Sequence, residues 1–216
     1  MISLNLKKRI YTSIALFFLI ILVLYYKFIL AYTLIVLGVY AIIEFTNISK
    51  RIFINRYSII ILNIFFITYI FLFCFMFFFF STFYLIKTIL FSILLSCIAS
   101  DIGGYIVGKN LKGPRLTKIS PNKTYSGAAG SLIFSSAILS GSIFFFTNNF
   151  NFKIIICAML ISIACQIGDL LFSFLKRKAK LKDTGNILPG HGGVLDRIDG
   201  YLLGIPVGLL SLILFL

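Results

Sequence analysis

YSIIILNIFFITYIFLFCFMFFFF, residues 57–80, contains no acidic or basic side chain. A bilayer core about 30 Å thick is crossed by roughly 20 apolar residues in an α-helix, which rises about 1.5 Å per residue. This stretch is long enough to cross with some tilt. Its end, residues 75–80, is low in complexity, and we interpret it as lipid contact without a chemical role. The stretch predicts a membrane-spanning helix.

Six further apolar runs lie on either side of this segment. They cover residues 10–26, 28–43, 84–100, 127–147, 154–175 and a last run that ends at Leu216 and begins at Leu195 or Tyr201. Of the 216 residues, 60% are hydrophobic and 12% are charged, whereas soluble domains have about 25% charged residues. The sequence predicts an all-α polytopic membrane protein with about seven transmembrane helices.

The formal net charge is +14, and the basic residues are distributed unevenly among the loops. With a cytoplasmic N-terminus, seventeen of the twenty lie on the cytoplasmic side: Lys7, Lys8, Arg9, Lys50, Arg51, Arg56, Lys109, Lys112, Arg115, Lys118, Lys123, Lys176, Arg177, Lys178, Lys180, Lys182 and Arg197. Cytoplasmic loops of membrane proteins carry such an excess. The charge therefore indicates the orientation of the chain in the membrane and not nucleic-acid binding. With seven spans, it predicts that the C-terminus lies on the outer side of the cytoplasmic membrane.

Two long polar segments, residues 101–126 and 176–199, share the predicted cytoplasmic side. Five of the six acidic residues lie in or beside them: Asp101, Asp169, Asp183, Asp196 and Asp199. Glu44 is the exception. Carboxylates gathered at helix ends in so basic a chain are suited to a divalent cation, although they also balance neighbouring lysines and arginines. We expect the two segments to form one interfacial site.

A polar stripe marks the end of the run at residues 154–175. Gln166, Asp169, Ser173 and Lys176 follow each other at helical offsets of three and four. Lipid would leave such groups unsatisfied, so the stripe faces protein or a wet cavity. Its alternative role is helix packing through hydrogen bonds.

The second polar segment combines cations, turns and acids. Lys176-Arg177-Lys178 alone is typical of a solvated helix end near anionic lipid. Glycines in the following 185–193 stretch allow backbone N–H groups to approach phosphate. Asp196 and Asp199 then share one face of the last helix, where they would bind a cation or cap the helix N-terminus.

Zinc chemistry is not favoured by the remaining residue types. The four cysteines (Cys74, Cys97, Cys157 and Cys165) all lie inside apolar runs, where we expect them to be packing residues. His191 is the only histidine, which excludes a multi-histidine zinc site. In its glycine-rich loop, His191 would contact phosphate or cap the turn.

These motifs resemble the signature of phosphatidate cytidylyltransferases (CDP-diacylglycerol synthases). The matching elements are S-x-x-K-R at residues 173–177, K-D at 182–183 and H-G-G-x-x-D-R-x-D at 191–199. Residues 120–127, SPNKTYSG, resemble the family's S-P-K-K-T-W-E-G block, and residues 101–105 resemble its D-x-x-A-Y. The departures are Asn122 for lysine, Tyr125 for tryptophan, Ser126 for glutamate and Gly104 for alanine.

The resemblance implies transfer of CMP from CTP to phosphatidic acid, giving CDP-diacylglycerol and pyrophosphate. It implies catalytic roles for Asp169, Asp196, Asp199, Lys176 and Ser173, the three aspartates binding Mg²⁺. It implies substrate or phosphate binding by Ser120, Lys123, Thr124, Arg177, Lys182, His191, Gly192, Gly193 and Arg197. A second, monovalent cation and a homodimer are implied by the family alone.

The resemblance also divides the chain, because it covers residues 101–199 and leaves the first hundred matched only as hydrophobic spans. We therefore expect about four N-terminal transmembrane helices in residues 1–100 and a catalytic membrane region in residues 101–216. The alternatives are a CTP-dependent lipid-alcohol kinase, which would move the γ-phosphate, and a transporter built around Asp169. A purely structural membrane anchor is less consistent with the motifs.

Overall fold

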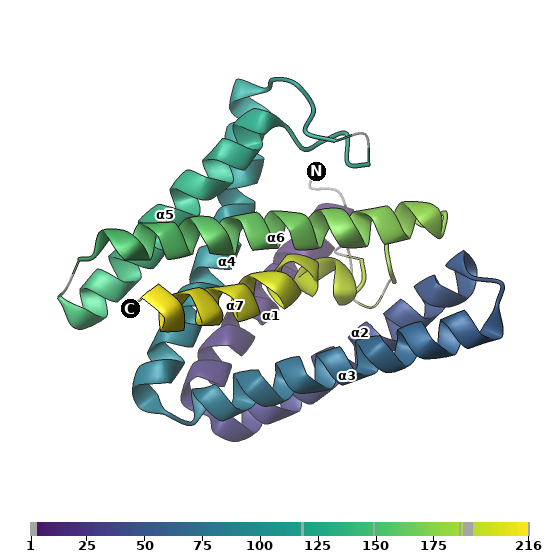
Figure 1. The fold of residues 1–216 in the computed structure, drawn as a ribbon, viewed down its shortest axis with the longest axis horizontal. Coiled ribbons are helices and arrows are strands. Elements are labelled where there is room, and N and C mark those ends of the chain that lie inside the picture. Colours follow the sequence, from purple (N-terminus) through teal and green to yellow (C-terminus); the bar gives the residue numbers. More distant parts are fainter. Residues whose placement is uncertain (1–3, 118, 149, 186, 188–191, 216) are drawn as a thin grey trace. The chain divides into compact units, whose positions relative to one another are not determined.

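The computed structural model describes residues 4–117, 119–148, 150–185, 187 and 192–215. These residues form seven helices: α1 (Leu4–Tyr25), α2 (Lys27–Ile52), α3 (Arg56–Ser81), α4 (Tyr84–Leu111), α5 (Tyr125–Thr147), α6 (Phe152–Lys178) and α7 (Leu195–Phe215) (Figure 1). Within the same residues the only β-pairing is an isolated bridge between Arg115 and Thr124. The predicted all-α class is confirmed.

Six helices, α2 to α7, are long and apolar enough to cross a membrane. The apolar part of α1, Ile14–Tyr25, is shorter than the 18 residues that such a span needs. Many large hydrophobic side chains along these helices are exposed, for example Phe65 and Phe71 on α3. Exposure of this kind is expected where lipid replaces water as the solvent. The protein is a polytopic membrane protein.

Two helices extend beyond their apolar runs. α2 continues from Ile43 to Ile52, and α4 continues from Ser100 to Leu111. Residues 101–111 were expected to belong to a polar segment, but they continue α4, and Gly103 and Gly104 within them pack closely against the neighbouring α5. The last helix begins at Leu195, the earlier of the two predicted starts.

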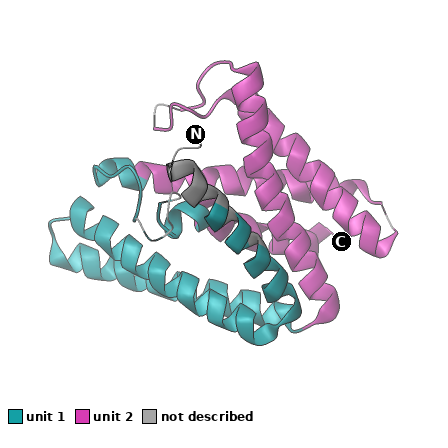
Figure 2. Cartoon of the chain, turned by 180° about the vertical axis from the view of Figure 1, so that it is seen from behind, with its two compact units in different colours: residues 1–82, 175–198 teal, residues 83–174, 199–216 magenta. Residues whose placement is uncertain are grey.

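The chain forms two compact units that interleave along the sequence (Figure 2). Unit 1 comprises residues 1–82 and 175–198, and unit 2 comprises residues 83–174 and 199–216. The predicted division into residues 1–100 and 101–216 separates the N-terminal spans from the region that carries the motifs. This division stays a prediction.

In unit 1, α2 and α3 lie side by side (Figure 1). The rings of Phe45 and Phe66 stack with their centroids 3.8 Å apart. Ser49, which is fully buried on α2, donates a 2.9 Å hydrogen bond to the Asn63 side chain on α3. Asn55 starts α3 by accepting a hydrogen bond from the Tyr57 N–H. This pair of helices is the scaffold on which Glu44 is placed.

In unit 2, α4 and α5 approach each other through glycines. A Cβ at Gly103 would lie 2.6 Å from Phe134, and a Cβ at Gly130 would lie 2.5 Å from Val107. Small residues allow such close packing in membranes, where apolar burial does not drive helices together. The contact orients the loop between α4 and α5, which carries Lys123.

Buried serines and cysteines lie among the apolar side chains of the unit 2 interior. Ser96 and Ser135 side chains are 2.7 Å apart, and Ser100 lies 2.8 Å from Ser162, so α4 is hydrogen-bonded to both α5 and α6. All four cysteines are free, and three of them are buried. This agrees with their predicted role as packing residues.

Candidate functional site

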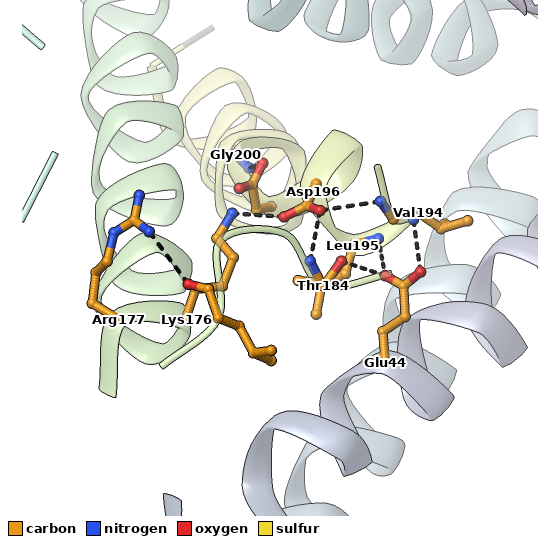
Figure 3. Close-up of polar contacts among 11 residues, drawn as sticks. Glu44, Lys176, Arg177, Thr184, Val194, Leu195, Asp196 and Gly200 are labelled. Atoms are coloured by element: carbon orange, nitrogen blue, oxygen red, sulfur yellow. Dashed lines mark hydrogen bonds and ion pairs between the residues drawn. The ribbon is translucent and has the colours of Figure 1, made fainter. Parts of the chain in front are cut away.

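Lys176 and Asp196 form a nearly buried ion pair in unit 1. The Lys176 Nζ lies 2.7 Å from the Asp196 Oδ1, and the two side chains are 12% and 7% exposed. A lysine at a membrane helix end normally extends toward water. Here the carboxylate holds the ammonium group in place (Figure 3).

The end of α6 turns the backbone directly after Lys176. Lys180 adopts a left-handed conformation with φ of 57°. Its N–H bonds the Arg177 carbonyl at 3.0 Å, and the Leu181 N–H bonds the Lys176 carbonyl at 2.8 Å. These two bonds are those of a Schellman motif, which usually has glycine at the left-handed position. The chain turns back sharply toward Asp196. Because the left-handed residue is Lys180 and not a glycine, the sequence did not indicate this turn.

The other Asp196 oxygen accepts two backbone hydrogen bonds. The N–H of Thr184 lies 2.8 Å from Oδ2, and the N–H of Gly193 lies 3.1 Å from it. Gly192 has φ of 86°, and a Cβ there would lie 3.1 Å from the same oxygen. The predicted glycines thus shape this site, and the Gly193 N–H donates to Asp196. Phosphate binding by Gly192 and Gly193 stays a prediction.

Glu44 is the site residue that sequence reasoning missed. It is 2% exposed and accepts hydrogen bonds from the Thr184 hydroxyl at 2.6 Å, the Val194 N–H at 3.0 Å and the Leu195 N–H at 2.8 Å (Figure 3). The sequence placed it apart from the other acids. The signal was its location in an apolar helix, where a carboxylate requires a buried partner.

In unit 2, Lys123 pairs with Asp169. The Lys123 Nζ lies 2.9 Å from the Asp169 Oδ2, with side chains 29% and 22% exposed. The loop that carries Lys123 closes by a hydrogen bond from the Lys123 N–H to the Ser120 carbonyl at 3.1 Å. Thr124 caps α5 by accepting from the Gly127 N–H at 3.1 Å. Ser120 and Thr124 therefore have structural roles here beside their predicted ones.

Two residues of this loop region that differ from the family block, Ser126 and Asn122, are described by the structure. Ser126 hydrogen-bonds the Lys112 carbonyl and lies 3.0 Å from the Thr124 hydroxyl, so it fastens the loop to the start of α5. Asn122 is exposed at the turn.

The remaining predicted residues that the structure describes differ in exposure. Asp199 is half-buried and accepts from the Gly200 N–H at 3.1 Å. Arg177 is exposed and donates to the Leu181 carbonyl at 3.3 Å, while Ser173 is half-buried. Lys182 and Arg197 are exposed. His191 lies outside the described residues.

The predicted residues fall into two clusters, one in each unit. Lys176 and Asp196 belong to unit 1, and Lys123 and Asp169 belong to unit 2. Among the described residues, no group of three histidine, cysteine or acidic side chains forms a metal site. That Asp169, Asp196 and Asp199 share a cation stays a prediction.

The fold and these clusters define a class: polytopic helical membrane proteins with lysine-paired carboxylates at helix ends, a chemistry suited to anionic substrates. A family model described as "Cytidylyltransferase family" matches residues 5–215. The chain belongs to this family.

Individual relatives agree with that assignment. A phosphatidate cytidylyltransferase of Helicobacter pylori is 42% identical over 132 residues, which cover 57% of this chain and 46% of the relative. One of Bacillus subtilis is 39% identical over 130 residues, covering 57% and 48%. One of Mycobacterium leprae is 38% identical over 113 residues, covering 52% and 36%. The chain spans about half the length, or less, of these relatives.

Proposed function

We propose that this chain is a phosphatidate cytidylyltransferase, which transfers CMP from CTP to phosphatidic acid and yields CDP-diacylglycerol and pyrophosphate. The observation that carries the proposal is the buried Lys176–Asp196 pair, built by the segment that resembles the family signature. The names of the relatives support the same activity. A cation held at fixed geometry at the end of a helix suits a reaction between two phosphates.

The reaction requires no covalent enzyme intermediate. A phosphate oxygen of phosphatidic acid attacks the α-phosphorus of CTP. As that bond forms, the bond from the α-phosphorus to the oxygen bridging to the β-phosphate breaks, and pyrophosphate leaves with this oxygen and its electron pair. Both reactants are anions, so the protein has to neutralise charge and align the attack.

We assign the charge neutralisation to Lys176, Lys123 and Arg197. Lys176 is fixed by Asp196, so its ammonium group would lose little side-chain freedom on binding a phosphate. Ser173 supplies a hydrogen bond. The weaker contacts are assigned to Ser120, Thr124, Arg177, Lys182, His191, Gly192 and Gly193.

We further propose that Mg²⁺ is the cofactor, held by Asp169, Asp196 and Asp199. These donors are carboxylate oxygens, which suit a hard cation. Lys123 donates to one Asp169 oxygen and Lys176 to one Asp196 oxygen. A carboxylate has about four lone-pair sites, so each can accept a further contact. When bound, Mg²⁺ would neutralise phosphate charge and polarise the leaving group. A second, monovalent cation is part of the same proposal.

The proposed setting is the cytoplasmic membrane, with the N-terminus and the site inside and the C-terminus outside. The distribution of basic residues supports this orientation. In this setting CTP arrives from the cytoplasm, and phosphatidic acid keeps its acyl chains in the bilayer. A homodimer is also proposed.

The proposal is tested with the purified protein in detergent or lipid discs. CTP, Mg²⁺ and phosphatidic acids of several acyl compositions are supplied, and CDP-diacylglycerol and pyrophosphate are measured by mass spectrometry and a coupled phosphate assay. Formation of both products in equal amounts is expected. Absence of product with every acyl composition would reject the proposal. In a parallel reaction, a lipid alcohol replaces phosphatidic acid, and release of CDP with formation of the phosphorylated lipid alcohol would indicate the kinase alternative.

A further inference from the structure

Glu44 on α2 reaches the loop before α7 within unit 1. Its carboxylate is 2% exposed, although a buried charge is costly unless it is compensated. The three hydrogen bonds from Thr184, Val194 and Leu195 supply that compensation. Two of them come from the start of α7, where unpaired N–H groups favour a negative charge.

Glu44 and Asp196 bind the same two stretches of backbone. Glu44 accepts from the Thr184 hydroxyl, and Asp196 accepts from the Thr184 N–H. At the second stretch, Asp196 accepts from the Gly193 N–H and Glu44 accepts from the next two N–H groups. Figure 3 shows the two carboxylates on opposite sides of these stretches. A displacement of Glu44 would therefore move the groups that hold Asp196.

Gly185 and Gly193 lie very close to the Glu44 carboxylate. A Cβ at Gly185 would lie 2.6 Å from the Glu44 Oε1, and a Cβ at Gly193 would lie 2.5 Å from Oε2. Real Cβ atoms essentially never come this close to another heavy atom, so a side chain at either position would force the Glu44 carboxylate to shift. The backbone of the loop is packed directly against the carboxylate.

We propose that Glu44 is a positioning residue for the active site: through Thr184 and the start of α7 it fixes Asp196, and through Asp196 it fixes Lys176. The inference rests on the proposed cytidylyl transfer. It gives a role in the reaction to the N-terminal helices, which carry no motif of their own.

The test uses Glu44→Gln in the full-length protein. An amide has one acceptor oxygen, so in either orientation its NH₂ group faces a backbone N–H of Val194 or Leu195. We expect kcat to fall about 10- to 100-fold, as for other residues that orient a site through a neighbour, with KM for CTP and phosphatidic acid within about threefold of wild type. The thermal unfolding midpoint is measured on the same sample.

The matched control is Ser49→Ala, which removes another buried polar group from α2 that bonds Asn63 and not the loop. If Glu44 only stabilises the fold, the two variants lose stability and folded protein alike, and kcat per folded molecule stays normal in both. That result would overturn the proposal, as would an unchanged kcat in Glu44→Gln. If the wild-type protein makes no product, the proposed function fails and the inference fails with it, whereas an active wild-type protein with an unchanged kcat in Glu44→Gln overturns the inference alone.

A second pair of variants applies if Glu44→Gln does not fold. Thr184→Val keeps the side-chain shape but removes the hydroxyl that lies 2.6 Å from Glu44, and Thr184→Ser keeps that hydroxyl. We expect kcat to fall about three- to tenfold in the valine variant, because it removes one of the three hydrogen bonds that Glu44 accepts. In the serine variant it should return toward wild type. Equal kcat in the two variants would overturn the proposal.

Discussion

Removal of the Asp196 charge should abolish transfer and weaken the fold at one identifiable contact. In Asp196→Asn, the amide either faces the Lys176 ammonium with its NH₂ group or faces the two N–H groups of Thr184 and Gly193. In each orientation, the NH₂ group of the amide faces another hydrogen-bond donor, with no acceptor between them. Because the Lys176 side chain is only 12% exposed, water restores little of the loss.

The size of the effect follows from these contacts. A hydrogen bond to a charged group contributes about 1.5–3 kcal/mol, and removal of one partner of a fully buried pair costs about 3–5 kcal/mol. The Lys176–Asp196 pair lies between these cases, so we expect Asp196→Asn to lower the free energy of unfolding by about 2–3 kcal/mol. Turnover should fall by at least about 100-fold, as when a charge-stabilising group is removed from other active sites.

A double-mutant cycle separates the two effects. Unfolding of Asp196→Asn, Lys176→Met and the double variant is followed in mixed micelles titrated with denaturing detergent. Removing both partners leaves no unpaired charge, so the double variant should be about 2 kcal/mol more stable than the sum of the single losses predicts. All three variants should be inactive.

The control is Lys50→Met, which removes an exposed cation from the end of α2 and should retain activity and stability. Additive losses, within about 0.5 kcal/mol, would show that Lys176 and Asp196 are not paired in the folded protein. Near-normal turnover in Asp196→Asn would refute its assignment to the site.

Three further results are expected. Lys123→Met should lower turnover about tenfold or more while costing less stability than the unit 1 variants, because its pair with Asp169 is more exposed, and kinetics with unfolding measurements check this. Gly193→Ala should fail to fold stably, since its Cβ would overlap Glu44, whereas Gly141→Ala, with nothing within 4 Å, should be neutral or gain about 0.5–1 kcal/mol in the same unfolding assay. Chelation by EDTA should stop turnover and Mg²⁺, not Zn²⁺, should restore it; full activity in EDTA would contradict the proposed cofactor.

Most of the fold was predictable because lipid imposes a simple rule on the sequence. Long runs without charge have to be helices that satisfy their own backbone, and the runs gave α2 to α7 directly. The ends were harder to predict. Glycine weakens a helix locally, yet Gly103 and Gly104 lie inside α4, which runs to Leu111, and they allow α5 to approach closely.

The site was predictable where the motif is local. Asp196 and Lys176 were identified from a contiguous signature, and the structure pairs them. Glu44 was not identified, because its partners Thr184 and Leu195 are more than a hundred residues away in the sequence. A single sequence contains no local pattern that links an acid in one helix to backbone N–H groups at the start of another.

The central claim, transfer of a cytidylyl group, is tested most directly by the fate of labelled phosphate. Wild-type protein is given phosphatidic acid and Mg²⁺ with CTP that carries ³²P in either the α- or the γ-position. The account predicts that the α-label enters the lipid fraction as CDP-diacylglycerol and that the γ-label leaves in pyrophosphate. Entry of the γ-label into lipid, or absence of both labels from the expected products, would contradict it.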